Sequence, residues 1–181
     1  MKNEFDARRL DIRRFAEERG VIEATQPLSA FRRLLDEAEG RGTDEPVRWS
    51  ARGELLDPGH VQPDVWLHLE ASTRLTLTCQ RCLQPVRVPL EVRRSFRFVR
   101  DESTAASEDE ASEEDVLAES RSFDLLELAE DELLMELPLA PRHERCPVEL
   151  PMTAGEAEFE ATGGEKARPF EALGKLKSTR H

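Results

Sequence analysis

The chain has 181 residues and a net charge of −12, with 26 Lys and Arg residues against 38 Asp and Glu residues. Hydrophobic residues make up 38% of the chain and charged residues 35%, so only a small apolar core can form. We therefore expect one domain over residues 1–149 and a flexible tail over residues 150–181. No apolar run approaches the roughly 20 residues that cross a bilayer, and the N-terminal segment has no apolar stretch of signal-peptide type. These features predict a cytoplasmic protein without a membrane partner.

The first part of the chain predicts a strand and a helix. Helical spacing around Ile12 and Phe15 stops at Gly20, and the stretch VIEAT that follows indicates a short strand. Residues 28–38 predict a helix, because four apolar residues share one side: Leu28, Phe31, Leu34 and Leu35.

Residues 46–99 alternate between apolar and polar side chains, as strands with one buried face do. After the turn at Cys79, valines, leucines and phenylalanines keep one parity, interrupted only by Arg94, while arginines take the other. Pro89 indicates a sheet edge or a bulge. The pattern predicts a twisted antiparallel meander with one apolar face and one cationic face.

The segment 101–120 holds nine acidic residues and no basic one, so we expect a disordered loop there. Residues 123–137 predict the strongest helix, with Asp124 at its N-cap. The fold class that follows is α+β, a β-meander packed by two or three helices. In the tail, residues 168–177 predict a short amphipathic segment that orders on docking.

Cys79 and Cys82 have Cys-x-x-Cys spacing between two predicted strands. Two thiolates on a tight turn suit a tetrahedral zinc site, and His143 and Cys146 are candidates for the remaining two ligands. A redox dithiol is disfavoured, because a β-rich run and not a helix follows the pair. The alternative is a turn held by packing, with Cys79 buried as a small hydrophobic residue and Cys82 exposed.

The arginines of the predicted sheet are candidates for contact with RNA or another polyanion. Guanidinium groups form paired hydrogen bonds with phosphate and release its counterions. An ordinary solvated sheet face is the alternative. The candidate residues are Arg74, Arg81, Arg87, Arg93, Arg94 and Arg97.

Motifs of enzyme active sites are not found in the sequence. It contains no glycine-rich phosphate loop, no nucleophile elbow and no His-Glu-x-x-His. We expect a protein that is not an enzyme and has no small-molecule substrate.

Three stretches together resemble the YceD family, the large ribosomal RNA subunit accumulation proteins. They are LTCQRCLQPVRVPL at 77–90, FDLLELAEDELLMELPLAPRH at 123–143 with Cys146 following, and RPFEALGKLK at 168–177. The N-terminal stretch from Leu10 fits in order.

The resemblance implies a non-enzymatic bacterial protein that supports the synthesis, processing or accumulation of large-subunit (23S) ribosomal RNA. Its implied partners are ribosomal RNA or a precursor of the large subunit, or a basic ribosomal protein that it binds as an acidic adaptor. Some relatives complete a zinc ligand set with a second cysteine pair, where this chain has Cys146 alone. A Cys3His zinc site with His143 and a metal-free fold are therefore both open at this point.

Overall fold

The computed structural model describes residues 5–56 and 63–148. The chain divides into two units, Met1–Cys146 and Pro147–His181. The predicted tail and its docking segment 168–177 lie outside the described residues. Within the described part of the chain, no helix is long and apolar enough to span a membrane.

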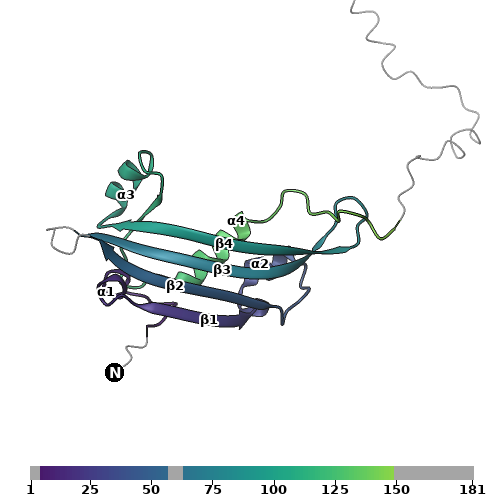
Figure 1. The fold of residues 1–181 in the computed structure, drawn as a ribbon, viewed down its shortest axis with the longest axis horizontal. Coiled ribbons are helices and arrows are strands. Elements are labelled where there is room, and N and C mark those ends of the chain that lie inside the picture. The colour runs from purple at the N-terminus through teal and green to yellow at the C-terminus, as the bar shows by residue number, and fades with distance from the viewer. Residues whose placement is uncertain (1–4, 57–62, 149–181) are drawn as a thin grey trace, which may run out of the picture. The chain divides into compact units, whose positions relative to one another are not determined.

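The first unit is built on a five-stranded sheet with strand order β1-β2-β3-β4-β5 (Figure 1). Strands β1 to β4 are antiparallel neighbours, whereas β5 pairs in parallel with the end of β4. The elements are α1 (Ile12–Glu17), β1 (Val21–Pro27), the 3-10 helix η1 (Leu28–Ala30), α2 (Arg32–Glu37), β2 (Pro46–Leu56), β3 (Asp64–Thr78), β4 (Pro85–Val99), α3 (Glu102–Asp109), β5 (Asp115–Ala118) and α4 (Leu125–Met135). The predicted α+β class and antiparallel meander are confirmed.

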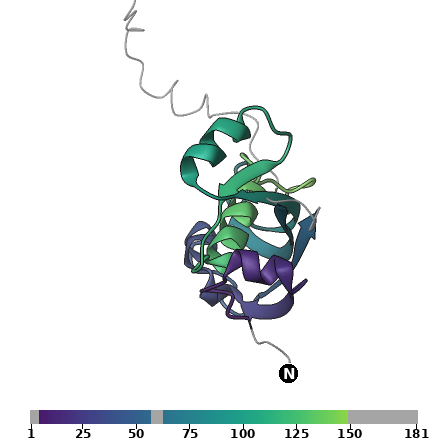
Figure 2. The ribbon, with the colours of Figure 1, turned by 90° about the vertical axis from the view of Figure 1, so that its left-hand side faces the viewer.

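One face of the sheet is buried and the other is exposed, as the alternation predicted. Buried and accessible residues alternate along β2, β3 and most of β4. Helices α1, α2 and α4 lie on the buried side (Figure 2). Among the described residues, strand β4 pairs only with β3 at Pro89, so this proline lies on a sheet edge as expected.

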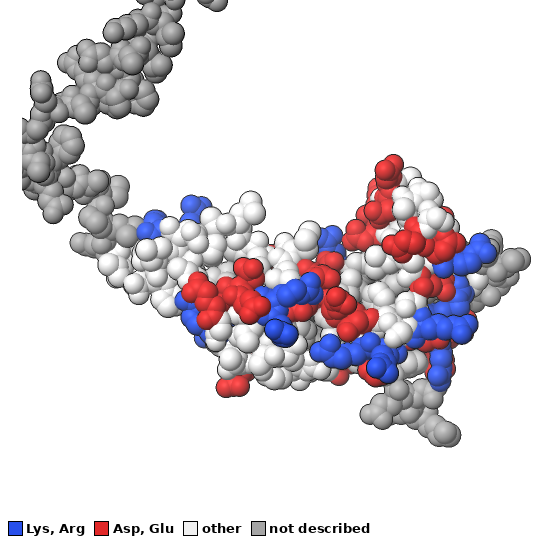
Figure 3. All heavy atoms as spheres, turned by 180° about the vertical axis from the view of Figure 1, so that it is seen from behind, with Lys and Arg blue, Asp and Glu red and all other residues white. Residues whose placement is uncertain are grey.

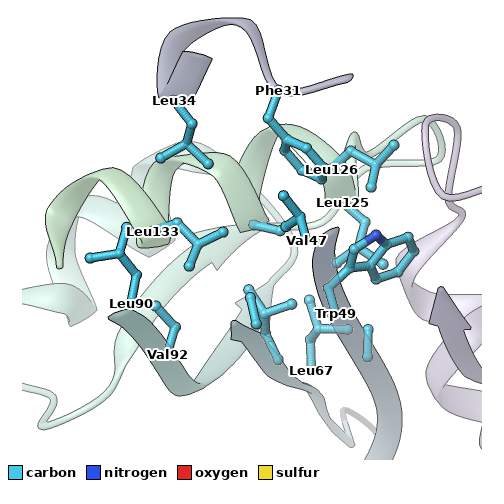
Figure 4. Packing of buried hydrophobic residues seen from close by; sticks show 14 of the residues in the cluster. Phe31, Leu34, Val47, Trp49, Leu67, Leu90, Val92, Leu125, Leu126 and Leu133 are labelled. Atoms are coloured by element: carbon cyan, nitrogen blue, oxygen red, sulfur yellow. The ribbon is translucent and has the colours of Figure 1, made fainter. Parts of the chain in front are cut away.

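Helix α4 supplies the centre of the core. Asp124 caps it by accepting hydrogen bonds from the backbone N–H groups of Leu126 and Glu127, both at 3.0 Å. Leu133 lies against Leu90 and Val92 of β4 (Figure 4) and is fully buried. The helix therefore fixes the position of β4 and of the segment that follows α4.

The acidic segment 101–120 is ordered, so the prediction of a disordered loop was wrong. It forms α3 and β5. Asp101 accepts from the backbone N–H of Thr104 at 2.9 Å and caps α3. The Arg97 guanidinium pairs with the Glu108 carboxylate at 2.8 Å, which offsets part of the repulsion among the acids. The Asp101 cap and the ion pair with Arg97 of the sheet outweigh the repulsion among the acidic residues of this segment.

We predict that Leu133→Ala lowers the free energy of unfolding by about 2–5 kcal/mol, because it leaves a cavity in the core. Met135→Ala is the matched control in the same helix. Its side chain is 78% exposed, so its substitution changes stability by less than about 0.5 kcal/mol. Urea unfolding of both variants measures the difference. Equal losses would contradict the placement of α4 on the sheet.

We predict that α3 loses its N-terminal order in acid. Hydrogen bonds from the Ser103 hydroxyl, the Thr104 backbone and the Thr104 hydroxyl lower the pKa of Asp101 to about 2. An unfolded aspartate has a pKa of about 3.9. The ionised cap therefore stabilises α3 above about pH 4, and this stabilisation is lost as the pH falls towards 2.

An NMR titration of the Asp101 carboxyl carbon and of the α3 Cα shifts measures this loss. Asp101→Asn is the control, since asparagine also caps helices but does not titrate. A wild-type carboxyl that titrates near 3.9 would show that the cap is not formed.

Candidate metal centre and nucleic-acid interface

Two of the three cysteines lie in the tight turn that joins β3 to β4. The Cys79 N–H donates to the Gln84 carbonyl oxygen at 2.9 Å, and the Leu83 N–H donates to the Cys79 carbonyl oxygen at 2.9 Å. Leu83 takes a left-handed conformation with φ 59°. We call residues 79–84 the knuckle. Its backbone bonds hold Cys79 and Cys82 on one turn.

The segment that follows α4 returns to the knuckle. The Gln80 N–H donates to the carbonyl oxygen of Pro141 at 2.8 Å. Beyond this bond, the Nδ1 atom of His143 lies 3.4 Å from the Sγ atom of Cys82, although the two residues are 61 positions apart in sequence. The fold thus brings together two halves of a site that the sequence separates.

The four predicted metal ligands form one cluster. Their ligand atoms all lie within 4.8 Å of one another, and the members are Cys79, Cys82, His143 and Cys146. All three cysteines are free thiols, with Cys79 buried and the other two partly accessible. This Cys3His cluster can hold a metal ion.

Hydrogen bonding fixes the orientation of the His143 ring. Its Nε2 atom lies 3.0 Å from the carbonyl oxygen of Pro85, which can only accept, so Nε2 carries the proton. Nδ1 is then the atom with a free lone pair, and it faces the Cys82 sulfur. Metal-binding histidines are commonly oriented in this way by a backbone carbonyl.

The surroundings of the two knuckle thiols shift their pKa values in opposite directions. Burial raises the pKa of Cys79, but backbone hydrogen bonds from Cys82, His143 and Arg81 outweigh it and lower the pKa to about 5. Burial and the neighbouring sulfur atoms of Cys146 and Cys79 raise the pKa of Cys82. The site therefore favours one thiolate at the buried position before any cation is present.

Arg81 contacts this cluster through hydrogen bonds. Its Nε atom donates to the Cys146 Sγ atom at 3.0 Å, and its Nη2 atom donates to the carbonyl oxygen of His143 at 3.1 Å. Interaction with the Cys146 sulfur raises the pKa of this guanidinium. Arg81, which the sequence suggested for phosphate contact, here orients the two C-terminal members of the cluster.

Three of the other candidate arginines lie on the outer face of the sheet and are ion-paired. The pairs are Arg87 with Glu45 at 2.9 Å, Arg93 with Glu70 at 3.0 Å and Arg97 with Glu108 at 2.8 Å. Arg94 has the opposite parity, and it pairs with Glu132 of α4 at 3.4 Å. Arg74 is exposed and has no ion pair with any residue of the described ranges.

The outer face contains a groove of about 970 Å³ with mixed charge. Its charged lining residues are Glu23, Arg48, Glu70, Glu91 and Arg93. Arg48 and Arg52, both on β2, are exposed on this face and lack an ion pair within the described part of the chain. The alternation of β2 predicts that both arginines lie on the polar face of the sheet, but the sequence analysis did not single them out.

Two further arginines lie next to the predicted metal ligands. Arg142 precedes His143 and Arg145 precedes Cys146. Both side chains are exposed, and neither has an ion pair with another described residue. The sequence analysis did not single them out, because they lie outside the regular strands on which it searched for a charged face.

Comparison with known proteins gives one family. The model of the family described as large ribosomal RNA subunit accumulation protein YceD matches residues 67–177. A protein of the same name from Haemophilus influenzae is 35% identical to this chain over 106 residues.

That alignment covers 56% of this chain and 59% of the relative, so the chain spans a little over half of the relative's length. No solved structure matches. The matched range 67–177 contains all four members of the Cys3His cluster. The chain belongs to the YceD family.

Proposed function

We propose that this protein supports the accumulation of large-subunit ribosomal RNA in the cytoplasm, without catalysing a reaction. The observation that carries the proposal is the family match over residues 67–177, since the H. influenzae relative is named for this role. The structure supports a binding role, because its most chemically distinctive residues, the three cysteines and His143, form a closed ligand cluster beside the surface of the first unit.

We further propose that the Cys3His cluster holds zinc. Zn–S distances near 2.3 Å and Zn–N distances near 2.0 Å place tetrahedral ligand atoms roughly 3.5–4 Å apart. The observed limit of 4.8 Å needs only a small contraction. Thiolates and imidazole suit zinc, and four protein ligands leave no open position for a substrate. The ion would cross-link the knuckle to the segment that follows α4.

We predict that the full-length protein binds one Zn²⁺ and that Cys82→Ser or His143→Ala abolishes tight binding, since each removes a ligand. Arg81→Ala keeps all four ligands but loses their orientation, so we expect a loss of affinity of about 10- to 100-fold. Competition with a chromophoric chelator measures the affinity, and elemental analysis measures the stoichiometry.

His68→Ala is the control for the zinc experiment. His68 lies on the outer face of the sheet, where it bonds Glu54 and Ser95, and its loss should leave zinc binding unchanged. A wild-type protein that is folded, reduced and metal-free after zinc addition would refute the zinc proposal.

The six arginines predicted from sequence stay part of the proposal as polyanion contacts. Ion pairing of Arg87, Arg93, Arg94 and Arg97 reduces the charge that they can offer to phosphate. Arg74 keeps its charge free of such a pair within the described part. The outer sheet face is therefore a weaker candidate for RNA contact than its arginine content indicates.

We predict that crosslinking in cells, with the tagged full-length chain, enriches large-subunit ribosomal RNA over small-subunit ribosomal RNA. Sequencing of the bound RNA makes the comparison, and co-purified proteins are identified in the same sample. Incubation of purified protein with precursor RNA should leave the RNA's length and modification unchanged. Equal recovery of both ribosomal RNAs, or cleavage of the precursor, would overturn the proposal.

A second candidate function is an acidic adaptor for a basic large-subunit ribosomal protein. The favouring observation is the excess of 38 acidic over 26 basic residues, together with the acidic side chains that gather over α3 (Figure 3). RNase treatment of the crosslinked sample separates the two. An adaptor keeps its ribosomal protein after RNase, and an RNA-binding factor loses it.

A further inference from the structure

One end of the first unit differs in charge from the rest. We call residues 79–85 and 139–146 the knuckle end. One main-chain hydrogen bond, from Gln80 to Pro141, and side-chain bonds from Arg81 and His143 join the two stretches. They contain three arginines and a single glutamate, whereas acids outnumber bases over the whole chain. In Figure 3 the end opposite α3 shows basic atoms among uncharged ones, while acidic atoms cover α3.

Arg142 and Arg145 are candidates for binding an external anion. Both are exposed and lack an ion pair within the described residues, unlike four of the six arginines predicted from the sheet pattern. Their backbone is nevertheless held in place, because Arg81 bonds the carbonyl oxygens of His143 and Glu144. An ordered peptide backbone with two guanidinium groups that have no acidic partner among the described residues suits contact with RNA phosphates, since little order must be gained on binding.

An aliphatic side chain projects from the same end. Leu83 is 73% exposed and sits at the left-handed position of the knuckle, a conformation that leucine rarely adopts. Leu139, just after α4, is also exposed. Neither side chain contributes much to the core, so their exposure beside arginines is consistent with contact to the apolar faces of unstacked bases.

We infer that the knuckle end binds single-stranded segments of ribosomal RNA, with Arg142 and Arg145 on phosphates and Leu83 against a base. The inference rests on the proposed function and names its contact surface. Unpaired loops and bulges are the RNA elements that fit this surface, because their bases are accessible to side chains whereas those of a duplex are stacked. A basic protein partner fits poorly, since this end would repel it.

The test is binding of the zinc-loaded full-length protein to a large-subunit ribosomal RNA transcript and to a single-stranded RNA of mixed sequence, at several salt concentrations. Arg142→Gln with Arg145→Gln removes two contacts. The slope of log affinity against log salt should then become shallower by about 1.4, at about 0.7 per phosphate on a single strand. Leu83→Ser should weaken binding without changing this slope.

The matched control is Arg48→Gln with Arg52→Gln. It removes the same charge from exposed arginines of the outer sheet face that have no ion pair with a described residue, and it should leave the slope nearly unchanged. Zinc content and urea unfolding confirm that each variant is folded. An unchanged slope in the knuckle variant, or an equal change in the control, overturns the inference while the proposed function stands.

Two other outcomes are also decisive. If the wild-type protein binds neither RNA, direct RNA contact fails and the inference falls with it. If crosslinks from the knuckle end reach only a ribosomal protein, the surface is a protein interface, and the adaptor function is favoured.

Discussion

Burial of one face of the long β3–β4 hairpin is the constraint on which the rest of the structure depends. Leu67, Leu75 and Leu90 point to the helices and are almost completely buried, so the strand register cannot slip by one residue without exposing them. That register fixes where the hairpin ends and hence where the knuckle lies. It also fixes α4, which packs on the same face and directs the following segment back to the knuckle. The proximity of the four Cys3His residues is therefore a consequence of core packing.

The sequence predicted those parts of the fold that depend on local periodicity. Alternation identified β2, β3 and β4, and residue chemistry alone paired His143 and Cys146 with the knuckle cysteines. The sequence analysis failed where charges that are distant in sequence decide whether a segment is ordered or an arginine is neutralised. The segment 101–120 was expected to be disordered because its acids were counted without Arg97, which pairs with Glu108. The parity of an arginine could be predicted, but the acid that neutralises it could not, since Glu45 lies 42 positions from Arg87.

Several arginines in the described part of the first unit act as cross-links between elements. Arg33 of α2 bonds Glu130 of α4 at 3.2 Å, and Arg13 of α1 bonds Glu119, just after β5, at 2.8 Å between Nε and Oε2. Exposed pairs of this kind contribute little stability individually, but each removes a cation from the surface available to a polyanion. A one-signed strand face is thus a weak indicator of RNA binding in an acidic protein, and an arginine without an acidic neighbour is a better one.

Along residues 142–146 the predicted metal ligands alternate with two arginines that have no ion pair among the described residues, so metal binding here would be physically linked to surface charge. Arg142 is adjacent to His143, and Arg145 is adjacent to Cys146. A metal that fixes the two ligands also fixes the backbone from which both guanidinium groups project. Hydrogen bonds from Arg81 and Gln80 also hold that backbone, and an ion bound to the two ligands would add to its rigidity. Preorganisation of this kind would lower the entropic cost of binding, which links the proposed zinc cluster to the proposed RNA contact.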